Sequence, residues 1–184
     1  MLDGWHEFYA LLGTAAAALV ALLFVAMSIG ATVLNPARAG ATRTFLSPVV
    51  FHYTSVLFVS LIVLIPIQTP MSLGVTVGIV AAIGFVYSIV IFARLIRDDV
   101  ADLADHFGYG ASPVVAYAAA LVAAWLLAAQ SGVGAAILAG ALLLLLVVNI
   151  RNAWDLTLAF ARRQAELSRQ VHPPENGSSQ PPSP

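Results

Sequence analysis

One ionisable side chain, His52, lies inside a long apolar run of this sequence. The segment 44–93 around it contains no Asp, Glu, Lys or Arg. Tyr53 is adjacent and Ser55 is about one helical turn away, so hydroxyl groups are available to an imidazole. Because an ionisable group inside a membrane is a functional hypothesis by default, we take His52, Tyr53 and Ser55 as the candidate intramembrane polar site. His52 is either a hydrogen-bonded structural residue or a group that transfers protons or contacts a ligand or metal.

A second set of ionisable residues follows that run. Asp98, Asp102, Asp105 and His106 are spaced so that one helix face would carry all four. A hard cation needs about six or more converging oxygens, which one exposed helix face does not supply. We therefore interpret these residues as a solvated helix face and predict no metal site.

Other chemistry is limited by composition and by missing motifs. The chain has no cysteine, which excludes disulfides, thiolate metal sites and thiol catalysis. It also lacks a Ser/His/Asp set, a glycine-rich phosphate loop and a zinc-protease motif. The net charge of −1 argues against a nucleic-acid partner. We predict a protein without catalytic residues or cofactor.

The elements that must position His52 are membrane helices. With 60% hydrophobic and 9% charged residues, the composition is that of a membrane protein and not of a soluble domain. A bilayer crossing needs about 20 apolar residues, and breaks near residues 35–43, 66–70, 94–112 and 130–134 divide the chain. We predict an all-α integral membrane protein whose bundle of five transmembrane helices covers residues 8–34, 45–66, 70–93, 113–130 and 133–150.

Two further segments have amphipathic patterns. Residues 94–107 are predicted as a short cytoplasmic surface helix, and residues 151–170 either extend the fifth helix into water or lie along the lipid surface. These segments complete a transmembrane domain of residues 1–170. The polar, proline-rich residues 171–184 are predicted as a disordered cytoplasmic tail.

The start of the second helix determines how deep His52 lies. Thr44 and the pair Ser47-Pro48 are alternative starts, because Ser is a good N-cap and Pro a good first residue. A start at Pro48 leaves His52 near the headgroups, whereas a start at Thr44 places it about 12 Å into the membrane.

The positions of the arginines predict how the chain is oriented in the membrane. With five crossings, the arginines of the first loop, the third loop and the C-terminal segment all fall on one side of the membrane. The positive-inside rule makes that side the cytoplasm and places the N-terminus outside. Trp5, Phe8 and Tyr9 are then expected in the outer interface as an aromatic belt.

Small residues recur every four positions in several of these helices, a spacing that lets membrane helices pack closely. We expect a tightly packed bundle, with self-association or contact with other membrane proteins. The residues are Gly13, Ala17, Ala21, Gly74, Gly78, Ala82, Ala116, Ala120, Ala124, Ala128, Gly132, Ala136 and Gly140.

Several stretches in about the first 70 residues resemble a group of small multi-pass bacterial inner-membrane proteins without assigned activity. They are 5–8 (Trp-His-Glu-Phe), 15–19, 23–28 and 43–48, followed by His52. The resemblance implies a bacterial origin and a multi-pass inner-membrane location, and it carries over no site residues. We expect a non-enzymatic accessory or structural partner of other membrane proteins. The alternative is a small oligomeric channel or transporter with a polar path around His52, Tyr53 and Ser55.

Overall fold

A computed structural model of the chain describes residues 3–31, 39–66, 68–97 and 110–171. These residues form helices and no strand, which confirms the predicted all-α class. The described helices follow one another along the chain. They are η1 Asp3–Trp5, α1 His6–Ala31, α2 Ala39–Leu64, α3 Pro70–Arg97, α5 Ser112–Ala128 and α6 Val133–Val171.

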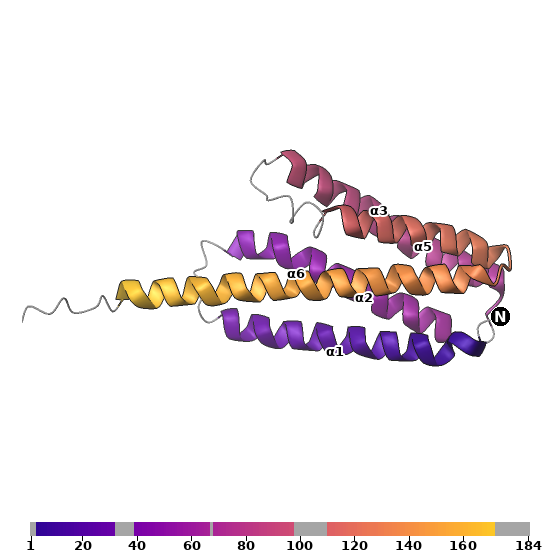
Figure 1. Cartoon of the computed structure of the whole chain (residues 1–184), viewed down its shortest axis with the longest axis horizontal. Coiled ribbons are helices and arrows are strands. Elements are labelled where there is room, and N and C mark those ends of the chain that lie inside the picture. The colour runs from indigo at the N-terminus through magenta and orange to yellow at the C-terminus, as the bar shows by residue number, and fades with distance from the viewer. Residues whose placement is uncertain (1–2, 32–38, 67, 98–109, 172–184) are drawn as a thin grey trace, which may run out of the picture.

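The long helices lie roughly side by side in an elongated bundle (Figure 1). α3 packs mainly on α5, α5 on α6, and α1 on α2. α2 also contacts α6 and α3, so it links the α1 side of the bundle to the α3 and α5 side. α6 runs the whole length of the bundle and projects beyond it at one end (Figure 1).

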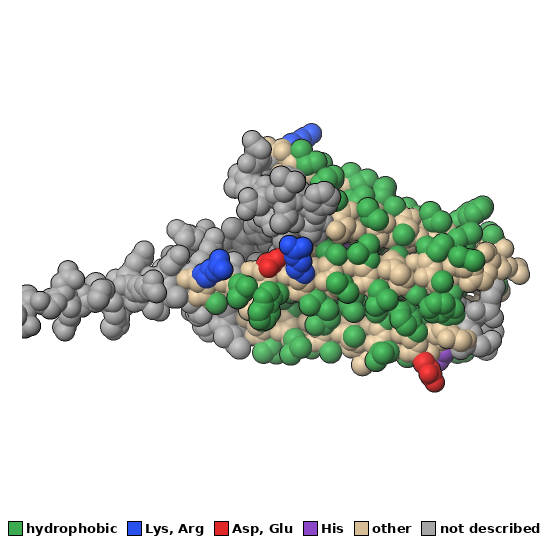
Figure 2. Space-filling view, viewed as in Figure 1, with side chains coloured by type: hydrophobic (Ala, Val, Ile, Leu, Met, Phe, Trp, Pro, Cys, Tyr) green, Lys and Arg blue, Asp and Glu red, His purple; other side chains and the backbone are tan. Residues whose placement is uncertain are grey.

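The surface of the bundle is apolar. Large hydrophobic side chains are exposed on every long helix, for example Leu11 at 72%, Ile79 at 58% and Trp125 at 70%. Figure 2 shows hydrophobic side chains along the visible face, with arginines toward the end from which α6 projects and an acidic residue at the opposite end. Exposed apolar surface on this scale is typical of a face that contacts lipid or another protein.

Three helices within the described residues are long and apolar enough to cross a membrane. They are His6–Ala26 of α1, the whole of α3, and Val133–Asp155 of α6. Pro48–Leu64 of α2 and Ser112–Ala128 are shorter apolar helices.

Glycines and alanines produce the closest helix contacts. A β-carbon added to Gly74 would lie 2.6 Å from the backbone oxygen of Ala124, so α3 and α5 touch through their backbones here. Ala116, Ala120 and Ala124 of α5 are buried as well. Of the small residues predicted for the fifth helix, Gly132 precedes α6, and Ala136 and Gly140 are exposed. Gly134 and Ala135 of α6 are buried, and a β-carbon added to Gly134 would lie 2.9 Å from the backbone nitrogen of Leu127 in α5.

α2 starts earlier than either predicted position. Residues 39–43, predicted as loop, belong to α2, and Pro48 lies inside the helix. A proline lacks the N–H that would bond the carbonyl one turn earlier, and for this reason Pro48 was one of the two alternative helix starts. With helix on both sides of it, Pro48 instead removes one backbone hydrogen bond within α2.

Two other segments also differ from their sequence-based descriptions. α3 continues to Arg97, so residues 94–97 of the predicted surface segment belong to α3, and residues 98–107 lie outside the described part of the chain. Residues 151–170 continue α6, which ends at Val171. Val171 is therefore helical, and the rest of the predicted tail lies outside the described residues.

Candidate functional site

His52 lies at the centre of α2. Thirteen residues precede it in the helix and twelve follow, which places it about 20 Å from either end by helix rise. Its side chain is only 3% exposed. A neutral imidazole at this position needs a hydrogen-bond partner, because an unpaired polar group in an apolar interior is costly.

The partner of His52 is Tyr117 of α5. The His52 Nδ1 atom and the Tyr117 hydroxyl oxygen are 3.0 Å apart, and the imidazole tautomer determines which of them donates the hydrogen. Tyr117 is itself 2% exposed, so both ends of the hydrogen bond are removed from the surface. The bond connects two helices that are 65 residues apart in sequence.

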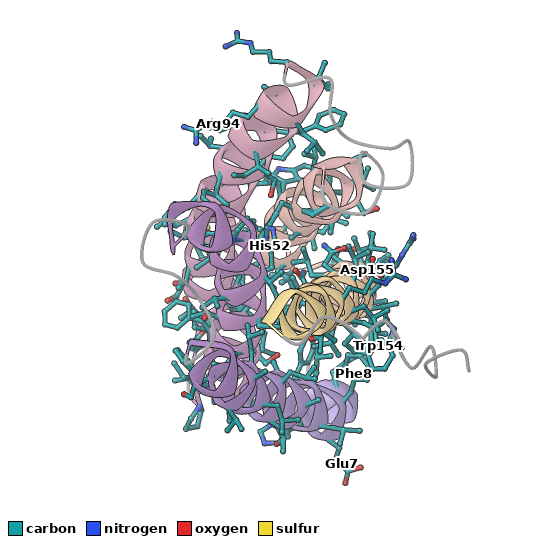
Figure 3. All side chains as sticks on the ribbon, turned by 90° about the vertical axis from the view of Figure 1, so that its left-hand side faces the viewer. Glu7, Phe8, His52, Arg94, Trp154 and Asp155 are labelled. Carbon is teal, nitrogen blue, oxygen red and sulfur yellow. The ribbon has the colours of Figure 1, made fainter. Side chains whose placement is uncertain are left out.

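Aromatic rings surround this hydrogen bond. The Tyr117 ring is tilted over the imidazole, and the two ring centres are 5.5 Å apart. The ring of Tyr87 in α3 makes an edge contact with the imidazole, with the ring centres 6.2 Å apart. The ring centres of Phe51 and Tyr87 are 4.5 Å apart. Three helices therefore meet at His52, which Figure 3 shows inside the bundle and not on its surface.

Gly84 of α3 makes room for Tyr117. A β-carbon at this position would overlap the Tyr117 ring. The ring cannot move away freely, because its hydroxyl is bonded to His52. The absence of a side chain at residue 84 therefore positions Tyr117 as much as the hydrogen bond does.

The other two predicted site residues occupy different surroundings. Ser55 is buried, lies next to Tyr117, and donates a hydrogen bond to the Phe51 carbonyl oxygen at 2.9 Å. Tyr53 is also buried, but its hydroxyl makes no hydrogen bond within the described residues. The structure thus places His52 and Ser55 beside Tyr117, whereas Tyr53 has no part in that cluster.

Sequence reasoning missed Tyr117. Its signal was present, because Tyr117 is the only hydroxyl-bearing residue between Pro113 and Gln130. Two asparagines of α6 were missed as well: Asn149 is 0% exposed and Asn152 is 2% exposed. Asn149 donates to the Leu145 carbonyl oxygen at 2.7 Å, and its own side-chain oxygen has no partner in the described part of the chain.

Tyr9 differs from the expected aromatic belt. It is 0% exposed, and its hydroxyl donates to the Ala135 carbonyl oxygen at 2.7 Å. This hydrogen bond joins α1 to the first turn of α6. Tyr9 was expected at the surface because it follows Trp5 and Phe8, but it shares the inner face of α1 with Leu12 and Ala16, which are buried too.

The cluster around His52 has no charged neighbour among the side chains that the structure describes. Every described Asp, Glu and Arg side chain is exposed. His6 is exposed beside Glu7 at the start of α1, and no group of three potential metal ligands occurs within the described residues. Asp98, Asp102, Asp105 and His106 lie outside those residues. The arrangement can therefore hold helices together through neutral hydrogen bonds.

Comparison with known protein families, with curated proteins and with solved structures gives no match to this chain. The resemblance to small bacterial inner-membrane proteins therefore stays a prediction.

Proposed function

We propose that this chain is a non-enzymatic protein of the bacterial inner membrane that acts as an accessory or structural partner of other membrane proteins. The observation that carries the proposal is the use of its buried polar groups. The hydrogen bonds of His52 with Tyr117 and of Tyr9 with Ala135 each join two helices. Polar groups committed to helix association support a structural role more than a catalytic one.

The proposed topology has five crossings, with the N-terminus outside and the C-terminus in the cytoplasm. Three described helices meet the length of a crossing by themselves. α5 has 17 residues, at the lower limit of a crossing, and α2 has 26. Arg94 and Arg97 lie in the last turn of α3, and Arg151 and Arg162 follow the apolar section of α6. All four side chains are exposed. Their positions support a cytoplasmic location of these two ends.

A small channel or transporter is the second candidate. Its support is a set of buried polar atoms that have no hydrogen-bond partner within the described residues: Tyr53 Oη, Ser60 Oγ, Ser88 Oγ and Asn149 Oδ1. Such atoms in a folded protein are usually satisfied by water or an ion. A path for protons or ions through the bundle would supply that partner.

Reconstitution separates the two candidates. Purified protein in liposomes with a pH-sensitive dye inside should give no proton flux above that of empty liposomes, and affinity purification from native membranes should yield a defined complex with another membrane protein. Flux that His52→Ala abolishes would replace the accessory role with the channel. Purification of the chain free of other proteins would also contradict the accessory role.

A further inference from the structure

An exposed stripe of α6 recurs with the spacing of a coiled coil. Positions that alternate three and four residues apart form the a and d positions of a heptad repeat. We define the α6 seam as the six such residues Ala136, Gly140, Leu143, Val147, Ile150 and Trp154, all of which are exposed. The same spacing continues to Thr157 and Ala161, which are exposed as well.

Within the described residues, the seam lies on the exposed side of α6. A β-carbon added to Gly140 would meet no atom within 4 Å, whereas one added to Gly74 would collide with α5. The f positions on the opposite side of the helix are Leu138, Leu145 and Asn152, which are buried against the bundle. Small residues at a free helix face permit the backbone of another helix to approach closely.

The apolar part of the seam ends at Trp154, and the next two positions of the same spacing are Thr157 and Ala161. Trp154 is 63% exposed and Leu158, which flanks the seam, is 39% exposed. Figure 3 shows Trp154 and Asp155 on the outer side of α6, away from His52. Lipid tails cover apolar side chains within the membrane, whereas Leu158 and Ala161 lie beyond Arg151, where the helix of a partner would cover them.

Charges avoid the seam. Asp155 and Arg162, the charged side chains after Trp154 that the structure describes, are exposed and fall at b positions of the heptad, which point away from a partner helix. Arg151 flanks the seam, and its Nε atom lies 3.9 Å from a carboxylate oxygen of Asp155 on the same helix. Two identical helices can therefore meet along this face without bringing like charges together.

We propose that the α6 seam binds the α6 seam of a second copy of this chain, as a parallel two-stranded coiled coil that begins inside the membrane and continues beyond it. The inference rests on the membrane insertion proposed above, because copies inserted in one orientation bring their seams together in parallel and in register. A second copy supplies the matching 3.5-residue stripe by symmetry, and two-fold dimers are the commonest assemblies. Gly140 lies where the two backbones come closest.

Disulfide cross-linking in native membranes tests the contact, because the full-length chain has no cysteine of its own. Ala161→Cys introduces a thiol on the line of the seam, and Arg162→Cys introduces one at an exposed neighbour off it. Under mild oxidation, we expect Ala161→Cys to form a disulfide-linked dimer about tenfold faster than Arg162→Cys. A non-reducing gel measures both rates.

A second substitution tests the seam inside the membrane. Gly140→Leu has space in the monomer but obstructs close approach of two helices, so it should lower the Ala161→Cys cross-linking rate about fivefold or more. Ala82→Leu is the control, since Ala82 is an exposed small residue on α3 and should leave the rate unchanged. Equal rates for Ala161→Cys and Arg162→Cys, no dimer for either, or no effect of Gly140→Leu would overturn the proposal. None of these results depends on whether the protein conducts protons or binds another protein.

Discussion

The hydrogen bond between His52 and Tyr117 is buried at both ends, so losing one partner leaves the other unpaired. An unpaired buried group costs more free energy than the hydrogen bond itself contributes. Tyr117→Phe removes only the hydroxyl and keeps the ring that fills the space beside Gly84. We expect this substitution to lower the free energy of unfolding by about 0.5–2 kcal/mol.

Unfolding in mixed detergent micelles with increasing sodium dodecyl sulfate measures that change. Tyr53→Phe is the matched control, because it deletes a buried hydroxyl that has no partner in the described part of the chain. Tyr53→Phe should leave the free energy of unfolding unchanged or raise it slightly. A Tyr117→Phe variant as stable as the Tyr53→Phe variant would show that the bond to His52 contributes nothing.

The sequence predicted one of the two residues in the hydrogen bond between His52 and Tyr117. His52 and Ser55 stood out because they are polar groups in an uncharged run, and the structure buries both of them beside Tyr117. Tyr117 was not found, because helix periodicity gives the neighbours of a residue on its own helix and says nothing of contacts 65 residues away. For the same reason, the hydrogen bond that buries Tyr9 against α6 could not be anticipated.

At the scale of elements, α3 and α5 are held together by close contact of small residues. Gly74 and Gly78 lie one turn apart on α3, and only Gly74 is in backbone contact with α5. Its added β-carbon would lie 2.6 Å from the Ala124 oxygen, whereas that of Gly78 would lie 3.6 Å from the Ala124 β-carbon, an ordinary contact distance. Gly74→Ala should therefore destabilise the bundle by about 1–3 kcal/mol through overpacking.

Gly78→Ala adds the same methyl group without a collision. It should leave stability unchanged or raise it by up to about 1 kcal/mol, because alanine favours helix over glycine. Both variants can be compared by thermal unfolding in detergent. If Gly78→Ala proved the more harmful of the two, the packing of α3 on α5 described above would be wrong.

The turn between α5 and α6 contains a residue in a left-handed conformation. Gln130 has φ of 59°, and the N–H groups of Gln130 and Ser131 donate to the carbonyl oxygens of Leu127 and Leu126. This is the hydrogen-bond pattern of a helix end that usually carries glycine at the left-handed position. Gln130→Gly should raise the free energy of unfolding by about 0.5–1 kcal/mol.

The same unfolding assay with Gln130→Ala provides the comparison. Alanine keeps the β-carbon that makes this conformation unfavourable, so no gain is expected from it. A stabilisation by alanine equal to that by glycine would assign the effect to loss of the glutamine side chain and not to the backbone.

The elements themselves were partly predictable. Uncharged apolar runs indicated helices, and the all-α class is confirmed. Helix ends were harder, because Pro48 was one of two alternative starts and lies inside α2, and because residues 151–170 had two alternative interpretations and continue α6. Composition shows where a helix meets water, but a helix that continues into water keeps its backbone hydrogen bonds and need not stop there.

At the scale of the whole molecule, the exterior of the described bundle is apolar, and the buried side-chain hydrogen bonds of His52 and Tyr9 join helices. His52, Ser60, Ser88 and Asn149 are all inside, while Leu11, Ile79 and Trp125 are outside. This distribution is the reverse of that in a water-soluble bundle. It supports the proposed membrane insertion, and the arginine-bearing ends support the proposed orientation.

Cysteine labelling in intact cells tests that insertion most directly. The chain has no cysteine, so Met71→Cys at the start of α3 and Arg162→Cys in the projecting part of α6 each introduce a single exposed thiol. A membrane-impermeant maleimide added outside the inner membrane should label Met71→Cys and leave Arg162→Cys unlabelled until the membrane is opened. Labelling of both thiols from the same side would contradict the five-crossing arrangement.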